Sequence, residues 1–199
     1  MAFADIASLL AFTLIATISP GGATTLATAS GARFGYRRSL PLIIGIAVGL
    51  GTMAGVAALG LSQTLLAFPG LQVAMRAAGT AYLLWLAVRL IRQRAPSSGG
   101  NTSSPQSLIG GIWLVWHNPK GWAITTSASA AYVAIAHNPV DLASILAFLF
   151  ASMALVSLSA WCLAGQTLAR KLKSNAQWRL FNIGLAAILI LSIITLWFE

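Results

Sequence analysis

The sequence predicts an all-α integral membrane protein with six transmembrane helices in two inverted three-helix repeats, helices 1 and 4 being broken at Pro-x-Gly. Three observations lead to this fold class. The chain is 58% hydrophobic and only 8% charged, with a mean hydropathy of +0.83, whereas soluble domains carry about 25% charged residues. Its apolar residues form six long runs, and its basic residues cluster between alternate runs. Lipid is therefore expected to be the main solvent.

Each of the six apolar runs is long enough to cross about 30 Å of hydrocarbon at a rise of about 1.5 Å per residue. The first run lacks the basic flank of a secretory signal peptide and is expected to remain as a helix. The fourth run is longer than a straight span requires, which favours a broken or tilted helix. The expected spans are residues 4–29, 39–65, 70–92, 107–135, 141–166 and 178–198.

The charged residues predict the orientation of the chain. In a six-span protein, all three acids fall on one side of the membrane. The three connections on the other side carry ten of the twelve basic residues, namely Arg33, Arg37, Arg38, Arg89, Arg92, Arg94, Arg170, Lys171, Lys173 and Arg179. Because cytoplasmic loops are enriched in Lys and Arg, both termini are predicted to lie outside the cytoplasm. Arg76 can reach the outer interface, which leaves Lys120 to be explained.

A Gly-, Ser- and Pro-rich segment at about 94–106 is expected to be a cytoplasmic linker inside a single transmembrane domain, residues 1–199. It separates repeat 1, about 1–93, from repeat 2, about 107–199. Three spans per half is an odd number, so the two halves enter the membrane from opposite sides. This is the geometry of an inverted repeat.

Each half contains a Pro-x-Gly sequence inside an apolar run, in SPGGAT (19–24) and NPKGWA (118–123). Proline cannot donate to the carbonyl four residues earlier, and an unsatisfied group in hydrocarbon persists only where protein or a wet cavity covers it. A harmless kink is the alternative for either sequence alone. Their corresponding positions favour a substrate-binding site between the repeats, with Pro20, Gly21, Gly22, Asn118, Pro119, Lys120 and Gly121 as its candidate residues.

Lys120 indicates the charge of the expected ligand. It lies about 18 Å into its run by helical rise, where a lysine costs about 2.5–3.5 kcal/mol on insertion scales. No acid is expected nearby, so a bound anion can stabilise it, and the N-terminus of a restarted helix also attracts negative charge. A small carboxylate fits both features, whereas snorkelling of the lysine to an interface is the alternative. His117 is a candidate for proton coupling because an imidazole changes charge near neutral pH; a structural role for it stays open.

The remaining motifs predict packing rather than chemistry. Gly45, Gly49, Gly51 and Gly55 have the small-xxx-small spacing that permits close helix contact. No phosphate loop, metal-ligand cluster or Ser/His/Asp arrangement is found, so neither an enzyme nor a cofactor is expected. The short basic clusters do not favour nucleic-acid binding. The expected partners are the lipid bilayer and a small-molecule substrate, and a homodimer is one assembly that the sequence allows.

Four segments carry a family resemblance: SPGG (19–22), GYRRSLPLIIGIAVG (35–49), AGTAYLLWLAVRLIR (78–92) and GGIWLVWHNPKGWA (110–123). In this order they resemble the lysine-exporter (LysE) or homoserine/threonine-resistance (RhtB) type of amino-acid exporter. The resemblance implies a six-helix inner-membrane transporter that exports amino acids or related small zwitterionic or anionic metabolites. It also implies proton-motive force as the driver.

The chain departs from the family pattern at three places. Pro20-Gly21-Gly22 stands where the family usually reads Pro-Gly-Pro, and the usual Pro-Gln-Phe after helix 4 is missing. Leu50 and Gly51 stand where many members carry an acid, so a role of that acid in proton coupling or cation binding is not carried over. A passive small-solute channel and a non-transporting membrane accessory protein are the alternative functions, and uptake or efflux by purified protein in liposomes separates them.

Overall fold

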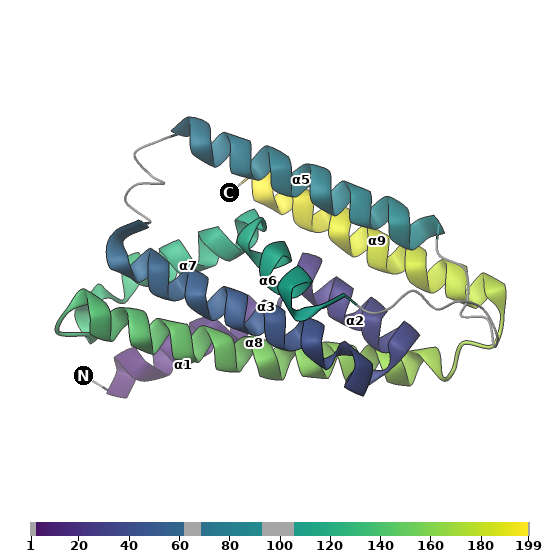
Figure 1. Cartoon of the computed structure of the whole chain (residues 1–199), viewed down its shortest axis with the longest axis horizontal. Helices are drawn as coiled ribbons and strands as arrows, with labels where there is room; N and C mark the ends of the chain where they lie inside the picture. Colours follow the sequence, from purple (N-terminus) through teal and green to yellow (C-terminus); the bar gives the residue numbers. More distant parts are fainter. Residues whose placement is uncertain (1–2, 62–68, 93–105, 199) are drawn as a thin grey trace.

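The computed structural model describes residues 3–61, 69–92 and 106–198, which form helices joined by short non-helical segments, with no strand among them. The expected all-α class is therefore confirmed for these residues (Figure 1). The elements are α1 (Phe3–Ile18), α2 (Gly22–Phe34), α3 (Tyr36–Val56), the short π-helix η1 (Ala57–Leu61), α5 (Pro69–Arg92), α6 (Leu108–Trp116), α7 (Pro119–Ala131), the 3-10 turn η2 (Val133–Ile135), α8 (Pro139–Ala169) and α9 (Asn175–Phe198).

The expected spans fall on single helices or on consecutive pairs. By length and composition, two described stretches, Tyr36–Gly60 and Pro139–Ala169, can each cross a membrane, and α1 with α2 makes a third when this pair is counted as one span bent by 57°. The helices α6 and α7 have 9 and 13 residues, and each is shorter than the roughly 20 residues of a full span. Six spans therefore stay a prediction. Of the linker expected at 94–106, all but residue 106 lies outside the described residues.

The centre of the fold is the contact between α3 and α8 (Figure 1). The helices α1 and α2 pack on α8, α6 packs on α3, and α5 lies beside α9. Glycines allow these approaches: a side chain at Gly31 would overlap the carbonyl of Cys162 in α8, and one at Gly45 would overlap that of Leu108 in α6. The packing role predicted for the α3 glycines is confirmed, since Gly45 and Gly49 face α6 whereas Gly51 and Gly55 face α8.

The turn from α2 to α3 is tighter than the sequence indicated. Arg33, Arg37 and Arg38 were expected in a connection, but they lie in helices, and only Gly35 separates α2 from α3. Gly35 has φ +79°, a conformation that glycine adopts without a Cβ clash. The next backbone N–H, that of Tyr36, donates to Oε1 of Gln166 at 2.8 Å. Likewise Arg179 lies inside α9 and not in the preceding connection.

The charge asymmetry of the sequence is also a spatial asymmetry. The α2–α3 turn, the ends of α5 and α8 and the start of α9 lie at one end of the molecule, at the right of Figure 1. The starts of α1 and α8, which carry Asp5 and Asp141, lie at the opposite end. The basic residues of these elements therefore gather at the end remote from both described acids.

Candidate substrate site

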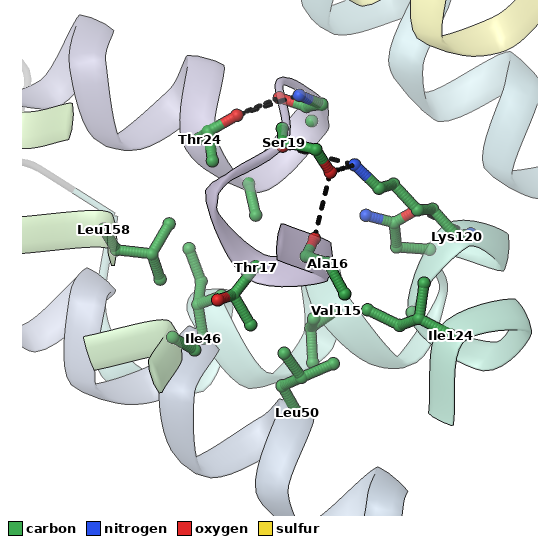
Figure 2. A pocket seen from close by; sticks show the side chains of 16 residues that line it. Ala16, Thr17, Ser19, Thr24, Ile46, Leu50, Val115, Lys120, Ile124 and Leu158 are labelled. Atoms are coloured by element: carbon green, nitrogen blue, oxygen red, sulfur yellow. Dashed lines mark hydrogen bonds between the residues drawn. The ribbon is translucent and has the colours of Figure 1, made fainter. Parts of the chain in front are cut away.

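A cavity lies where α1 gives way to α2 and α6 gives way to α7 (Figure 2). We call the residues between α1 and α2 the first junction (Ser19, Pro20 and Gly21) and those between α6 and α7 the second junction (His117 and Asn118). The cavity encloses about 440 Å³ of empty space including its open mouth, and α3 and α8 complete its wall. Five of the seven candidate site residues line it, namely Gly21, Gly22, Asn118, Lys120 and Gly121.

The last carbonyls of α1 are satisfied by side chains. Proline at position 20 frees the carbonyl of Ala16, and the Ser19 hydroxyl donates to this carbonyl at 3.0 Å. The next two carbonyls have donors on α8: the Ser157 hydroxyl donates to Thr17 at 2.9 Å and the Trp161 indole N–H donates to Ile18 at 3.1 Å. A helix end inside the protein is thus held without bare polar groups.

Lys120 satisfies the remaining oxygens of the first junction. Its Nζ donates to the Ser19 hydroxyl oxygen at 2.7 Å, to the Ser19 carbonyl at 3.2 Å and to the Pro20 carbonyl at 3.2 Å. A cation at the C-terminal end of a helix is also favoured by the helix dipole. The sequence interpretation looked for an acid beside this lysine and missed these neutral oxygens, which lie a hundred residues away along the chain.

The second junction is capped by residues close in sequence. The carbonyl of Val115, which Pro119 frees, accepts the backbone N–H of Asn118 at 3.0 Å. The Asn118 side chain accepts the backbone N–H of Lys120 at 3.1 Å and so acts as the N-cap of α7. Pro119 is the first residue of α7, the position where its missing N–H costs least. The interruption therefore precedes Pro119 and does not run through Pro-x-Gly as predicted.

Pro119 supports the cavity wall without lining it. It is buried but does not line the cavity. Its ring packs against Gly79 of α5, where a Cβ would come within 2.8 Å of Cγ. Gly79 entered the sequence analysis only as part of the segment 78–92. The Gly-x-x-Tyr spacing in this segment was the pattern that could have indicated its role. Gly79 thus allows α5 to support the second junction.

The N-terminal turn of α2 adds a partial positive charge to the cavity, beside the charge of Lys120. The hydroxyl of Thr24 accepts the backbone N–H of Gly21 at 2.8 Å (Figure 2). Gly22, Ala23 and Thr24, whose N–H groups belong to the first helical turn, line the cavity. A helix N-terminus attracts anions, and a Cβ on Gly21 would lie 3.3 Å from Nζ of Lys120. The ammonium and the helix N-terminus are therefore neighbours.

The cavity lining carries a cation and neutral oxygen atoms side by side. Lys120 and the start of α2 suit a carboxylate, whereas the carbonyls of Ser19 and Pro20 and the hydroxyls of Thr17 and Ser19 can accept from an ammonium group. No acid is among the lining residues. Apart from Asn118, the rest of the wall is apolar, with Ile46, Leu50, Val115, Ile124 and Leu158 labelled in Figure 2. Leu50 thus fills a wall position where the family resemblance led us to look for an acid.

Two other candidate residues lie outside this wall. The Pro20 side chain is exposed, although the Pro20 carbonyl contacts Lys120. His117 is exposed as well: its Nδ1 lies 2.9 Å from the Trp113 carbonyl, and its ring lies against the Trp113 indole with 3.9 Å between centroids. Within the described part of the chain, no group of three His, Cys, Asp or Glu side chains is placed to hold a metal ion.

Comparison with known proteins identifies relatives of the chain. The sequence model of LysE type translocators matches residues 14–196. The chain is 32% identical over 167 residues to a protein of Klebsiella pneumoniae named cysteine/O-acetylserine efflux protein, an alignment that covers 83% of this chain and 84% of the relative. It is 34% identical over 106 residues to an uncharacterized membrane protein of Vibrio cholerae, with half of each chain covered. No solved structure matches significantly.

Proposed function

Since this chain belongs to the LysE type translocator family, we propose that it is a secondary transporter that exports a small neutral amino acid across the inner membrane. Proton-motive force is the proposed driver. The chain is a helical membrane protein, as its apolar helices and its family indicate. One observation carries the proposal: the Lys120 ammonium and the N-terminus of α2 meet at one cavity, and the ammonium is held there by the carbonyls of Ser19 and Pro20.

The chemistry of the site suggests an exchange of hydrogen bonds on binding. The substrate carboxylate accepts hydrogen bonds from the Lys120 ammonium. The substrate ammonium then donates to the carbonyls of Ser19 and Pro20, to which Lys120 no longer donates. The number of hydrogen-bonded polar groups is unchanged, so neither the protein nor the substrate has an unpaired polar atom in a site of low dielectric. A ligand that lacks either charge breaks this balance. The proposed selectivity for zwitterions follows from it.

The substrate class follows from the size and charge of the cavity. Its lining contains no acid, which disfavours a substrate with a cationic side chain because that charge would have no counter-ion. The lining includes small side chains at Ala16, Thr17 and Ser19, which favours a substrate with a short side chain. The relative named for cysteine and O-acetylserine efflux supports a substrate of that size, and we propose these two compounds as the first to test.

The helix packing supports the proposed inverted repeat. Under that symmetry α1 and α2 correspond to α6 and α7, α3 corresponds to α8, and α5 corresponds to α9. The observed contacts respect this exchange: α3 meets α8, α5 meets α9, the first pair packs on α8 and the second pair packs on α3. With the basic end of the molecule in the cytoplasm, both termini would lie outside it. C-terminal fusion to a reporter active only in the cytoplasm is then expected to be silent.

Transport by purified protein in liposomes tests the function. Vesicles loaded with unlabelled L-cysteine or O-acetylserine are expected to accumulate the labelled compound by counterflow, and an imposed pH gradient is expected to change the rate. A passive channel gives no counterflow, and an accessory protein gives no flux above empty vesicles. A Lys173→Ala protein, which loses an exposed lysine outside the cavity, serves as the control for charge removal at Lys120.

A further inference from the structure

A second cavity lies between α2, α3 and α5, beside Gln106, two residues before α6. It encloses about 510 Å³ of empty space including its mouth, and Arg33 of α2 and Arg89 of α5 face it. Ser30 and Gln106 add neutral polar groups, and the remaining lining side chains are apolar. None of these residues was among the candidate site residues of the sequence. The cavity combines a partly buried cation, Arg33, and an exposed one, Arg89, with an apolar wall.

The charge of this cavity is not neutralised from within. Nε of Arg33 is buried and has no hydrogen-bond partner among the described residues, although buried donors in native proteins nearly always have one. Arg33 lies over the Phe34 ring and Arg89 over the Trp85 ring, at 5.8 and 5.3 Å from the centroids. Such contacts orient a guanidinium without removing its charge.

The two acids that the structure describes are remote from this cavity. The sequence contains three: Asp5 near the start of α1, Asp141 in the first turn of α8, and the terminal Glu199. Arg33 lies beside the α2–α3 turn, which contacts Gln166 near the far end of α8. By helical rise, 25 residues of α8 place Asp141 about 38 Å from that position. An anion from outside the chain is therefore the available counter-charge.

The two cavities follow one another along the same pair of helices. On α2, residues 22–24 line the Lys120 cavity and residues 26–34 contribute to the second one. On α3, Leu50 and Ile46 line the first cavity, and Leu42, one turn further, lines the second. The second cavity lies toward the basic end of the molecule, which the proposed orientation places in the cytoplasm.

We infer that Arg33 and Arg89 form a carboxylate-binding entry site, from which the substrate passes along α2 and α3 to Lys120. The inference rests on the proposed function. A guanidinium offers a planar fork that matches a carboxylate, and two of them at a cytoplasmic mouth concentrate an anionic group before it enters a neutral passage. The substrate carboxylate then passes from one cationic position to the next.

Uptake of reduced, radiolabelled L-cysteine into inside-out membrane vesicles tests the entry site. Arg33→Gln and Arg89→Gln are each expected to raise the half-saturating concentration about tenfold, because each variant loses one charge-assisted hydrogen bond to the substrate. The maximal rate is expected to change less than about twofold. In the double variant, the half-saturating concentration is expected to rise by less than the product of the two single increases, because both arginines bind the same substrate carboxylate. Thermal melting of each purified variant reports whether it is folded.

Two neighbouring arginines provide matched controls. Arg38→Gln removes an exposed charge that contacts the same Phe34 ring, and Arg92→Gln removes an exposed charge from the same helix as Arg89. Neither residue lines the cavity, and neither change is expected to alter the half-saturating concentration. Equal kinetics for all four variants would overturn the entry site while leaving the transporter intact. If wild-type vesicles fail to transport, the proposed function falls, and the entry site falls with it.

A lipid phosphate is the competing occupant. The same kinetics are therefore measured in liposomes with and without phosphatidylglycerol. An entry site predicts the same contrast between Arg33→Gln and Arg38→Gln in both lipids. A contrast that vanishes in zwitterionic lipid would show that the cavity holds an anionic headgroup and would overturn the inference.

Discussion

The two junctions solve one problem in different ways. Around the first junction, the carbonyls at positions 17 to 20 are satisfied by side chains of α7 and α8, which are 100 to 143 residues away. Around the second junction, the groups are satisfied within six residues: Asn118 caps α7, and the Trp122 indole N–H donates to the Trp116 carbonyl at 2.9 Å. The backbone groups of the second junction are thus capped locally, whereas those of the first are capped through tertiary contacts.

This contrast suggests a division of roles. A locally capped junction keeps its shape when its surroundings move, so the second junction can present Lys120 in a constant position. A junction that is capped by side chains of other helices changes its conformation when those hydrogen-bond donors bind another group. The first junction is therefore the element expected to respond when a substrate carboxylate takes Lys120. The predictions below test this contrast.

Replacement of Lys120 is expected to have the largest effect. Lys120→Ala removes the only donor described for the Pro20 carbonyl together with the proposed carboxylate ligand, so transport should fall at least about hundredfold, equivalent to about 3 kcal/mol. Lys120→Arg should also perform poorly, since a planar guanidinium is wider than an ammonium and Gly21 lies close by. Counterflow in liposomes measures both. Unchanged substrate affinity in Lys120→Ala would refute the role of Lys120 as ligand.

Disturbing the support of the second junction should come next. Gly79→Ala places a methyl group against the rigid Pro119 ring, which should shift the start of α7, lower transport about tenfold and reduce the melting temperature by several degrees. Gly184→Ala in α9, where a Cβ meets nothing within 4 Å, is the matched control. Identical behaviour of the two variants would show that the second junction is not held by α5.

Loss of a remote cap should have a moderate effect. Ser157→Ala leaves the Thr17 carbonyl without its donor and is expected to cost about 1–2 kcal/mol of stability. Thr167→Ala on the same helix removes a hydroxyl that bonds within its own helix and should be nearly neutral. Hydrogen exchange is expected to show faster opening at the end of α1 in Ser157→Ala alone. Uniform protection in both variants would remove the distinction between the junctions.

His117 is expected to give the smallest effect. Its ring lies outside the cavity against Trp113, so His117→Gln should change the transport rate less than about twofold between pH 6 and pH 8. The pH profile of the variant, compared with that of wild type, decides the proton-coupling role raised by the sequence. A profile that loses its pH dependence would restore that role and would imply coupling from outside the cavity.

The sequence predicted the positions of the helices well and their partners poorly. Proline and glycine residues in the sequence marked both junctions. These signals are local, so one sequence suffices to show them. The oxygens around Lys120 were not predictable, because they belong to a helix end a hundred residues away. The arginine-lined cavity was missed because arginines at helix ends were assigned to orientation alone.

The remote capping of the first junction constrains how the protein is made. The carbonyls of Ser19 and Pro20 precede their donor by about one hundred residues, and those of Thr17 and Ile18 wait still longer for α8. At a synthesis rate of about 5–20 residues per second, the end of α1 remains incomplete for about 5 to 30 s. A nascent chain in this interval exposes bare carbonyls to lipid or to the insertion machinery. Mutations that slow the arrival of α7 and α8 should therefore expose the chain to quality-control proteases without changing the finished transporter.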